Sequence, residues 1–145
     1  MTIGNEARYC AGVSDRDEEL IASLRRTYEA FSRADFDHAM EIAHPEVVLV
    51  PPGGQSPLKG ANALRAWMEP DAIEEQRIEP REFRVNGDKV LVHQRTWARG
   101  AGSGIELEVD LWVVWTLTDD GLVTRIEAFL VHQEGEALAA AGLQE

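Results

Sequence analysis

Apolar residues recur at helical spacing near the start of the chain and at alternating positions in its second half. Leu20, Leu24, Tyr28 and Phe31 follow one another at intervals of three or four, which predicts an amphipathic helix over residues 15–33. Residues 35–44 carry a second, shorter apolar stripe. The proline at position 45 is expected to end this second helix.

The middle and end of the chain read mainly as strands. Leu64 and Trp67 share one face of a short helix that ends before Pro70, whereas residues 134–141 form either a last helical turn or a frayed tail. Runs of β-branched and alternating residues predict strands over 47–50, 76–85, 89–98, 105–117 and 122–132. Helices followed by a meander indicate an α+β domain with the helices on one face of a curved antiparallel sheet.

Alternation along the strands separates two faces of this sheet. If the turns are centred on residues 101–102 and 119–120, the expected cross-strand pairs are Arg95–Glu108, His93–Asp110, Trp112–Glu127 and Val114–Arg125. These residues share an outer face of mixed polarity. A β-bulge would move His93, Arg95, Asp110 and Glu127 to the opposite face.

The inner face is almost entirely apolar. Together with the helices it supplies the residues that we expect around a ligand, which are Tyr28, Phe31, Leu64, Trp67, Gln94, Thr96, Val113, Trp115, Ala128 and Leu130. The main polar groups of this set are Tyr28, Gln94 and Thr96. The same residues could instead form a filled hydrophobic core.

Composition narrows the classes of partner. The 145 residues include 26 acidic and 14 basic side chains, for a formal charge of −12, which disfavours nucleic acid and anionic membranes as partners.

We expect one domain over residues 1–145, with a flexible or loosely packed N-terminus over 1–13. Cys10 is the single cysteine, no apolar run reaches the length of a membrane span, and no signal peptide is evident, so we expect a cytoplasmic protein.

Few residue clusters suggest a metal site or a catalytic site. Three acidic residues, Glu106, Glu108 and Asp110, share one strand face and could hold a hard cation, but pairing with the basic side chains of the neighbouring strand explains them better, and we assign no metal. His93 with Asp110 would form an acid–base pair if it faced the cavity, and His132 has inward parity at the end of the last strand. These three residues are the catalytic candidates.

Several short motifs occur in a specific order along the chain. They are His44-Pro45-Glu46-Val47, the Pro51-Pro52 turn, Arg99-Gly100-Ala101-Gly102-Ser103-Gly104 between two strands, and Glu136-Ala137-Leu138-Ala139-Ala140-Ala141-Gly142-Leu143. Over residues 28–143 the chain resembles the SnoaL-like branch of the nuclear transport factor 2-like superfamily. The resemblance implies a cone-shaped α+β barrel that encloses a small hydrophobic molecule and dimerises through its outer sheet face. We therefore expect a homodimer with Trp97 and Trp112 at its interface.

Catalytic residues of related enzymes are not matched in this chain. By the resemblance, the tyrosine and two aspartates of ketosteroid isomerases would fall at Thr27, Pro51 and Val113. The arginine–aspartate strand motif of epoxide hydrolases would fall at Arg95 and Trp97, which lacks the acid.

Three hypotheses follow. The first is a protein that binds a small, mostly apolar molecule without a cofactor, because the glycine loop over residues 99–104 lies between strands and no phosphate-binding motif is present. The second is a cofactor-independent enzyme of polyketide cyclase, isomerase or epoxide hydrolase type. The third is a non-catalytic assembly protein with a filled core.

Overall fold

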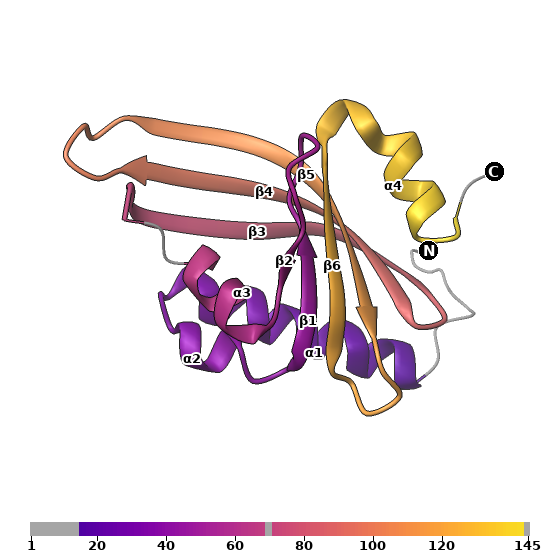
Figure 1. Ribbon diagram of the computed structural model, residues 1–145. Helices are drawn as coiled ribbons and strands as arrows, with labels where there is room; N and C mark the ends of the chain where they lie inside the picture. The colour runs from indigo at the N-terminus through magenta and orange to yellow at the C-terminus, as the bar shows by residue number, and fades with distance from the viewer. Residues whose placement is uncertain (1–14, 69–70, 144–145) are drawn as a thin grey trace.

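Two helices begin the described part of the chain, a third lies between the second and third strands, and a last helix follows the sheet (Figure 1). This computed structural model describes residues 15–68 and 71–143, so the expectation for residues 1–13 lies outside the described part. The elements are α1 (Asp15–Ser32), α2 (Phe36–Ala39), β1 (Ala43–Val50), β2 (Leu58–Lys59), α3 (Ala61–Met68), β3 (Ile73–Asn86), β4 (Lys89–Gly100), β5 (Glu106–Leu117), β6 (Val123–Leu130), the 3-10 turn η1 (Val131–Gln133) and α4 (Glu134–Ala140).

The strands form one mixed sheet in the order β2-β1-β6-β5-β4-β3. The α+β fold with N-terminal helices against one face is confirmed (Figure 1). The expectation of a wholly antiparallel sheet is wrong in one place, because β1 pairs with β6 in parallel. The second helix is also shorter than predicted, since α2 ends at Ala39 and the chain already enters β1 at Ala43, which places His44 in a strand rather than at a helix end.

Pairing of β4 with β5 differs from the predicted register by two residues. Arg95 lies opposite Asp110, and His93 lies opposite Trp112. The β5–β6 pairing has the same offset, with Val114 opposite Glu127. Because side chains alternate with a period of two, an error of two residues leaves every side chain on its predicted face. The β4–β5 pairs run without a shift from Lys89 to Arg99, so no bulge inverts the faces there.

Helix α1 packs against β3, which is an edge strand of the sheet. The Ser32 hydroxyl accepts from the Ile78 amide at 3.0 Å and donates to the Ile78 carbonyl at 3.2 Å. Arg25 lies over the Phe83 ring at 4.6 Å from its centroid. These contacts fix the helix across the sheet, and they also satisfy backbone groups of β3 that no strand pairs.

The outer face of the sheet is divided between two environments. At one end, α4 covers a second apolar cluster that contains Leu91 and Val114 with Ala137 and Ala141, so the expectation of a mixed polar face fails there. At the other end, the face carries charged residues of β3, β4 and β5. The segment predicted as a helical turn or a frayed tail is thus a docked helix.

The end of α4 is tied to the β3–β4 turn. Gly142 adopts a left-handed φ of +73° just after the helix, a conformation that favours glycine. The Asn86 side chain donates to the Ala141 carbonyl at 2.9 Å and to the Gly142 carbonyl at 3.1 Å. One asparagine therefore satisfies two carbonyl groups that the helix leaves unpaired.

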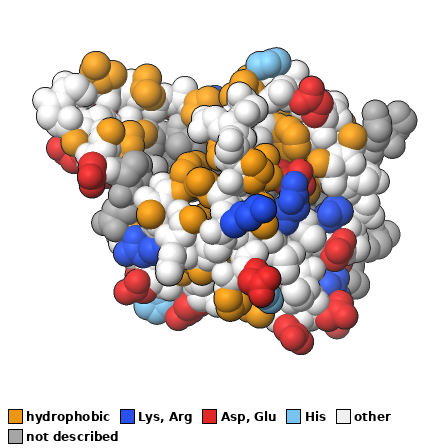
Figure 2. Space-filling model, viewed as in Figure 1, with side chains coloured by type: hydrophobic (Ala, Val, Ile, Leu, Met, Phe, Trp, Pro, Cys, Tyr) orange, Lys and Arg blue, Asp and Glu red, His pale blue; other side chains and the backbone are white. Residues whose placement is uncertain are grey.

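The β4–β5 hairpin projects beyond the helices (Figure 1). On its projecting part, the inner-face residues Ile105, Leu107 and Val109 are 62%, 64% and 44% exposed. Figure 2 shows hydrophobic side chains on this end of the molecule. The inner face is thus longer than the helices that cover it. Among the described residues, no helix is long and apolar enough to cross a membrane.

Replacement of Asn86 by alanine should loosen α4. The Asn86→Ala variant loses both bonds to the end of the helix, and we expect unfolding to cost about 1 kcal/mol less in urea titrations, with faster amide exchange in α4. Asn62→Ala, at an exposed position of α3, serves as the control and should change stability by less than about 0.5 kcal/mol. Unchanged exchange in α4 of the Asn86 variant would contradict this role.

Candidate functional site

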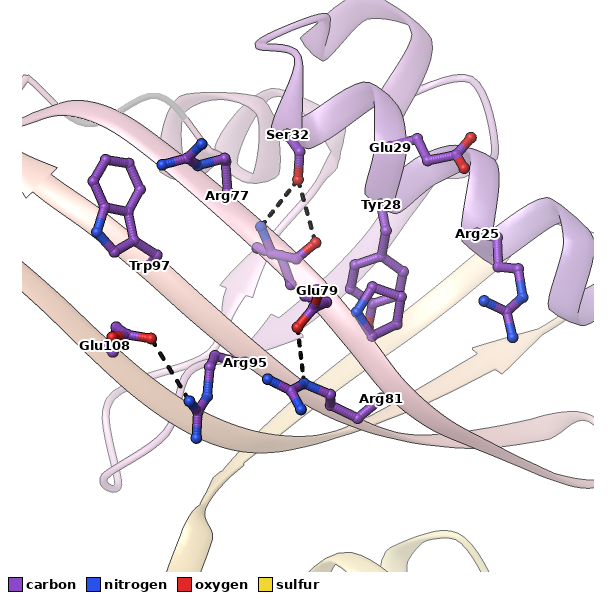
Figure 3. A pocket seen from close by; sticks show the side chains of 12 residues that line it. Arg25, Tyr28, Glu29, Ser32, Arg77, Glu79, Arg81, Arg95, Trp97 and Glu108 are labelled. Carbon is purple, nitrogen blue, oxygen red and sulfur yellow. Dashed lines mark hydrogen bonds and ion pairs between the residues drawn. The ribbon is translucent and has the colours of Figure 1, made fainter.

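A large open groove of about 660 Å³ lies beside α1 and β3 (Figure 3). Its walls are rich in arginine and glutamate. Many of these charges already contact one another or an aromatic ring: Arg77 lies 4.2 Å from the Trp97 ring centroid, Arg81 pairs with Glu79 at 2.9 Å and Arg95 pairs with Glu108 at 3.7 Å. The groove is therefore a charged, solvated surface whose main cations are engaged within the chain.

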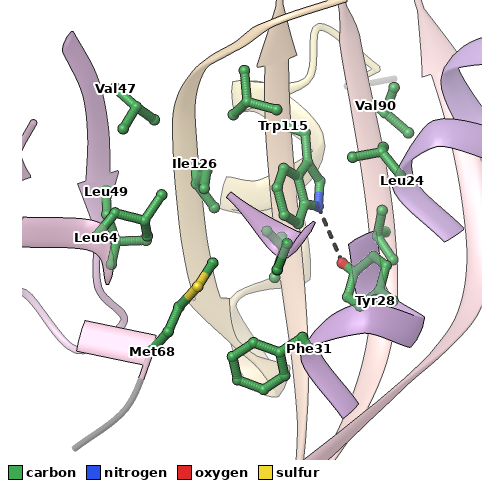
Figure 4. Close-up of a cluster of buried hydrophobic side chains, with 14 of the residues drawn as sticks. Leu24, Tyr28, Phe31, Val47, Leu49, Leu64, Met68, Val90, Trp115 and Ile126 are labelled. Carbon is green, nitrogen blue, oxygen red and sulfur yellow. Dashed lines mark hydrogen bonds between the residues drawn. The ribbon is translucent and has the colours of Figure 1, made fainter. Parts of the chain in front are cut away.

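A smaller cavity of about 130 Å³ lies between the helices and the inner face of the sheet. It takes residues from α1, α3, the end of β1 and the loop after it, the middle of β3, and the central strands. Its lining side chains are Thr27, Tyr28, Phe31, Leu49, Pro52, Leu64, Trp67, Met68, Ile78, Gln94, Leu111, Val113, Trp115, Ile126 and Ala128. Figure 4 shows several of them with the surrounding core. The polar side chains of this set come from α1 and the central strands, whereas the other walls are apolar.

Four side chains form a hydrogen-bonded series beside the cavity. The Trp115 indole donates to the Tyr28 hydroxyl at 3.1 Å (Figure 4). That hydroxyl donates to the Gln94 side-chain oxygen at 2.6 Å. The Gln94 amide nitrogen donates in turn to the Thr96 hydroxyl at 3.4 Å. Tyr28 also meets the Trp115 ring edge-on, with 5.7 Å between ring centroids.

Tyr28 is a neutral group at ordinary pH. Burial raises the pKa of its hydroxyl well above the usual value, and the hydrogen bond from Trp115 offsets only part of that rise. It is the one ionisable side chain among the described residues that line the cavity. The cavity thus offers hydrogen bonds without charge.

The sequence matches the family model of the SnoaL-like domain over residues 24–126. This range covers most of the chain. The chain belongs to the SnoaL-like family. The resemblance inferred from the sequence motifs is therefore confirmed.

Several solved structures share the fold of this chain. The epoxide hydrolase/cyclase-like enzyme SalBIII, of pyran ring formation in the polyether salinomycin, is 19% identical, with 81% of this chain and 95% of SalBIII covered at a TM-score of 0.72. An NTF2-like protein of unknown function from Burkholderia pseudomallei is 21% identical, with 79% and 92% covered at 0.68. A Mycobacterium tuberculosis protein in complex with estradiol-17beta-hemisuccinate is 17% identical, with 75% and 91% covered at 0.67. No curated protein matches the sequence.

The SnoaL-like domain brings most of the predicted ligand-contacting residues together. Eight of the ten line the cavity, namely Tyr28, Phe31, Leu64, Trp67, Gln94, Val113, Trp115 and Ala128. Thr96 lies one hydrogen bond behind Gln94, and Leu130 does not line the cavity. Contact with a ligand remains a prediction for all ten. Trp67 is 44% exposed, which places it where the cavity meets solvent.

Seven lining residues of the SnoaL-like domain were not among the predicted ones. Leu111 and Ile126 alternate in step with the inner-face residues that were predicted. Thr27 and Met68 lie on the apolar stripes of their helices. The sequence pattern could therefore have predicted these four. No periodicity marks Pro52, which lies in a loop. Leu49 and Ile78 come from strands whose position relative to the helices could not be derived from alternation.

The catalytic candidates lie away from the cavity. The His93 ring stacks on Trp112 on the outer face, with 4.5 Å between centroids, and its Nε2 atom is buried without a hydrogen-bond partner. Asp110 accepts two hydrogen bonds from Arg95, at 2.9 and 3.3 Å, which lower the pKa of its carboxyl group. His132 is exposed in η1.

The acidic residues of β5 are engaged with basic and aromatic neighbours. Glu108 pairs with Arg95 at 3.7 Å, and Glu106 accepts from the Trp97 indole at 2.9 Å. Arg99, another of the basic side chains of β4, pairs instead with Glu74 at 2.9 Å and Glu75 at 2.7 Å on β3. In the described part of the chain, no three metal-ligating side chains converge.

Removal of the Tyr28 hydroxyl should destabilise the domain in a pH-dependent way. In Tyr28→Phe, the Trp115 indole and the Gln94 oxygen both lose a buried partner, so we expect unfolding at pH 7 to cost roughly 1–3 kcal/mol less. Because burial raises the pKa of Tyr28, the wild type loses this hydroxyl's stabilisation as pH rises above the unfolded tyrosine value of about 10.

Urea titrations of both proteins between pH 7 and pH 11 measure the difference in stability between them. The difference should be constant near neutrality and shrink above about pH 10. A difference that grows with pH would contradict the neutral, buried state of the hydroxyl.

Proposed function

We propose that this SnoaL-like domain binds one small, neutral and mostly apolar molecule in the cavity beneath α1 and α3. The observation that carries the proposal is an unfilled volume of about 130 Å³ with walls that are apolar apart from a few hydrogen-bonding groups. Burial of apolar surface supplies affinity in such a site, and a few polar groups orient the ligand. The eight lining residues that the sequence predicted are the proposed contacts.

The arrangement of the cavity supports binding over a purely structural role. A filled core would leave no space between Phe31, Met68 and Trp115, whereas these side chains surround an open volume. Trp67 lies at the boundary with solvent and gives a route into it. The Mycobacterium tuberculosis neighbour is in complex with a steroid derivative, which is consistent with apolar ligands in this fold.

Binding is also better supported than the catalytic alternative. General acid–base catalysis needs a proton donor or acceptor within hydrogen-bond reach of the substrate. His93 and Asp110 face away from the cavity, and His132 is exposed beyond the last strand. SalBIII is an enzyme with the same fold, but fold alone does not carry an activity from one protein to another.

Filling the cavity should abolish binding without unfolding the domain. In Ala128→Leu, three added carbon atoms enter the space of about 130 Å³. We expect saturating toluene or cyclohexane to raise the melting temperature of the wild type by a few degrees. The same probes should not change the melting temperature of the Ala128→Leu variant. Ala66→Leu, at an exposed position of α3, adds the same atoms outside the cavity and should respond like the wild type. Failure of every apolar probe on the wild type would overturn the proposal.

We also propose that two copies of the domain associate through the projecting hairpin. Ile105, Leu107 and Val109 form an exposed apolar row without charge, whereas Glu106 and Glu108 point to the opposite face. At a net charge of −12, two copies repel each other over most of their surface, and an uncharged row is where they can approach. Such a dimer would cover apolar surface that the helices leave open.

The outer-face interface predicted from Trp97 and Trp112 has less free aromatic surface than the sequence suggested. Trp112 stacks on His93 and packs against the cluster under α4. Trp97 lies between Arg77 and Arg99, at 4.2 and 5.5 Å from its ring centroid. Both rings are therefore half-buried within their own chain.

Light scattering after size exclusion distinguishes the two interfaces. Leu107→Glu should convert a dimer into a monomer, because it places a charge in the apolar row, whereas Trp97→Ala should leave the dimer intact. If Trp97→Ala gives a monomer and Leu107→Glu remains a dimer, the results would favour the outer face as the interface. A wild-type monomer at about 100 μM would contradict both versions of the dimer.

A further inference from the structure

The hydrogen-bonding groups beside the cavity differ in how many protons they can still donate. Trp115 and Tyr28 carry one polar hydrogen each. The indole hydrogen of Trp115 is directed to Tyr28, and the hydroxyl hydrogen of Tyr28 is directed to Gln94. Both donors are therefore used within the protein, and neither is available to a ligand unless the series breaks.

Gln94 is the exception. Its side-chain nitrogen carries two hydrogens, and one of them contacts Thr96 in a long hydrogen bond of 3.4 Å. The second hydrogen has no partner among the described residues, although Gln94 is only 5% exposed and lines the cavity. A buried donor without an acceptor is unfavourable, so an acceptor brought in by a ligand would be bound preferentially.

The neighbours of Gln94 hold its amide in one orientation. The Tyr28 hydroxyl fixes the oxygen at 2.6 Å, and the Thr96 hydroxyl engages the nitrogen from behind. Rotation of the amide by half a turn would remove the oxygen that accepts from Tyr28 and would leave the buried hydroxyl hydrogen without its acceptor. The nitrogen side is thus presented to the cavity, with Tyr28 and Thr96 as positioning residues.

We infer that Gln94 is the specificity-determining residue of the cavity and that the ligand is an uncharged single-ring molecule with one oxygen acceptor, such as a ketone. This inference rests on the proposed function, since it names the class of molecule that the same cavity binds. No cation lines the cavity among the described residues, so a carboxylate would lose its hydration without gaining a counter-charge. An uncharged carbonyl oxygen requires only the one N–H group that Gln94 offers.

The size of the cavity limits the ligand to one ring. An apolar cavity of about 150 Å³ in another protein accommodates benzene. The cavity here measures about 130 Å³ and is continuous with solvent near Trp67. A six-membered ring with a short carbonyl substituent is therefore the class of molecule that it fits.

Acetophenone and α-methylstyrene form a suitable pair of probes, because they have the same shape and differ in a C=O against a C=CH₂ group. We expect the wild type to bind acetophenone roughly three- to tenfold more tightly than α-methylstyrene, the difference that one hydrogen bond supplies. Benzoate, a carboxylate of similar size, should bind more weakly than either. In ¹⁵N-resolved NMR, acetophenone should shift the side-chain amide signals of Gln94, and α-methylstyrene should leave them nearly unchanged.

Two variants locate the effect. Gln94→Met keeps a weak acceptor for Tyr28 but has no N–H group, so the preference for acetophenone should fall to about one while α-methylstyrene still binds. Ala66→Leu, at an exposed position of α3 outside the cavity, leaves Gln94 and both of its hydrogen-bond partners in place, so the preference should remain. If Gln94→Met fails to fold, the amide signals of the wild type decide the question.

Failure of this inference can be distinguished from failure of the proposed function. Equal affinity for acetophenone and α-methylstyrene would retain the cavity as a binding site and overturn the role of Gln94. A preference that survives in folded Gln94→Met, or tighter binding of benzoate, would overturn it as well. If none of the three probes binds the folded wild type, the binding function itself is wrong for molecules of this size.

Discussion

The continuous pairing of β4 with β5 is the constraint on which the rest of this molecule depends. Because every residue from Lys89 to Arg99 has a partner without a shift, side chains alternate strictly between two environments along both strands. Gln94 therefore reaches the cavity, while its neighbours His93 and Arg95 lie on the other side of the sheet. A single inserted residue in either strand would exchange the cavity wall with the charged surface.

Few polar groups surround the cavity, and most of their hydrogen bonds are made within the protein. Tyr28 contacts both Trp115 and Gln94, so one hydroxyl completes the hydrogen bonding of two strands and attaches them to α1. Without it, two buried polar atoms would lack partners, at a cost of roughly 1–3 kcal/mol against a domain's net stability of about 5–15 kcal/mol. The same hydroxyl keeps the site uncharged, since burial opposes its ionisation.

Local patterns predict much of this fold, and they fail where distant segments meet. Helical spacing located α1 and α3, and alternation assigned the faces of Gln94, Val113 and Trp115 even though the pairing was two residues off. The parallel pairing of β1 with β6 and the docking of α4 depend on contacts between segments far apart, for which periodicity holds no information. Pro52 also lines the cavity, and periodicity did not predict it because its place there depends on such a long-range contact.

The contact between Ser32 and Ile78 has a consequence for how copies of this protein can meet. Ser32 occupies both backbone groups of Ile78 on the open edge of β3, and Pro80, two residues further along the same edge, has no amide hydrogen to offer. An incoming strand would find neither position free. This part of the β3 edge is therefore closed to strand addition, the route by which exposed edges seed fibrils.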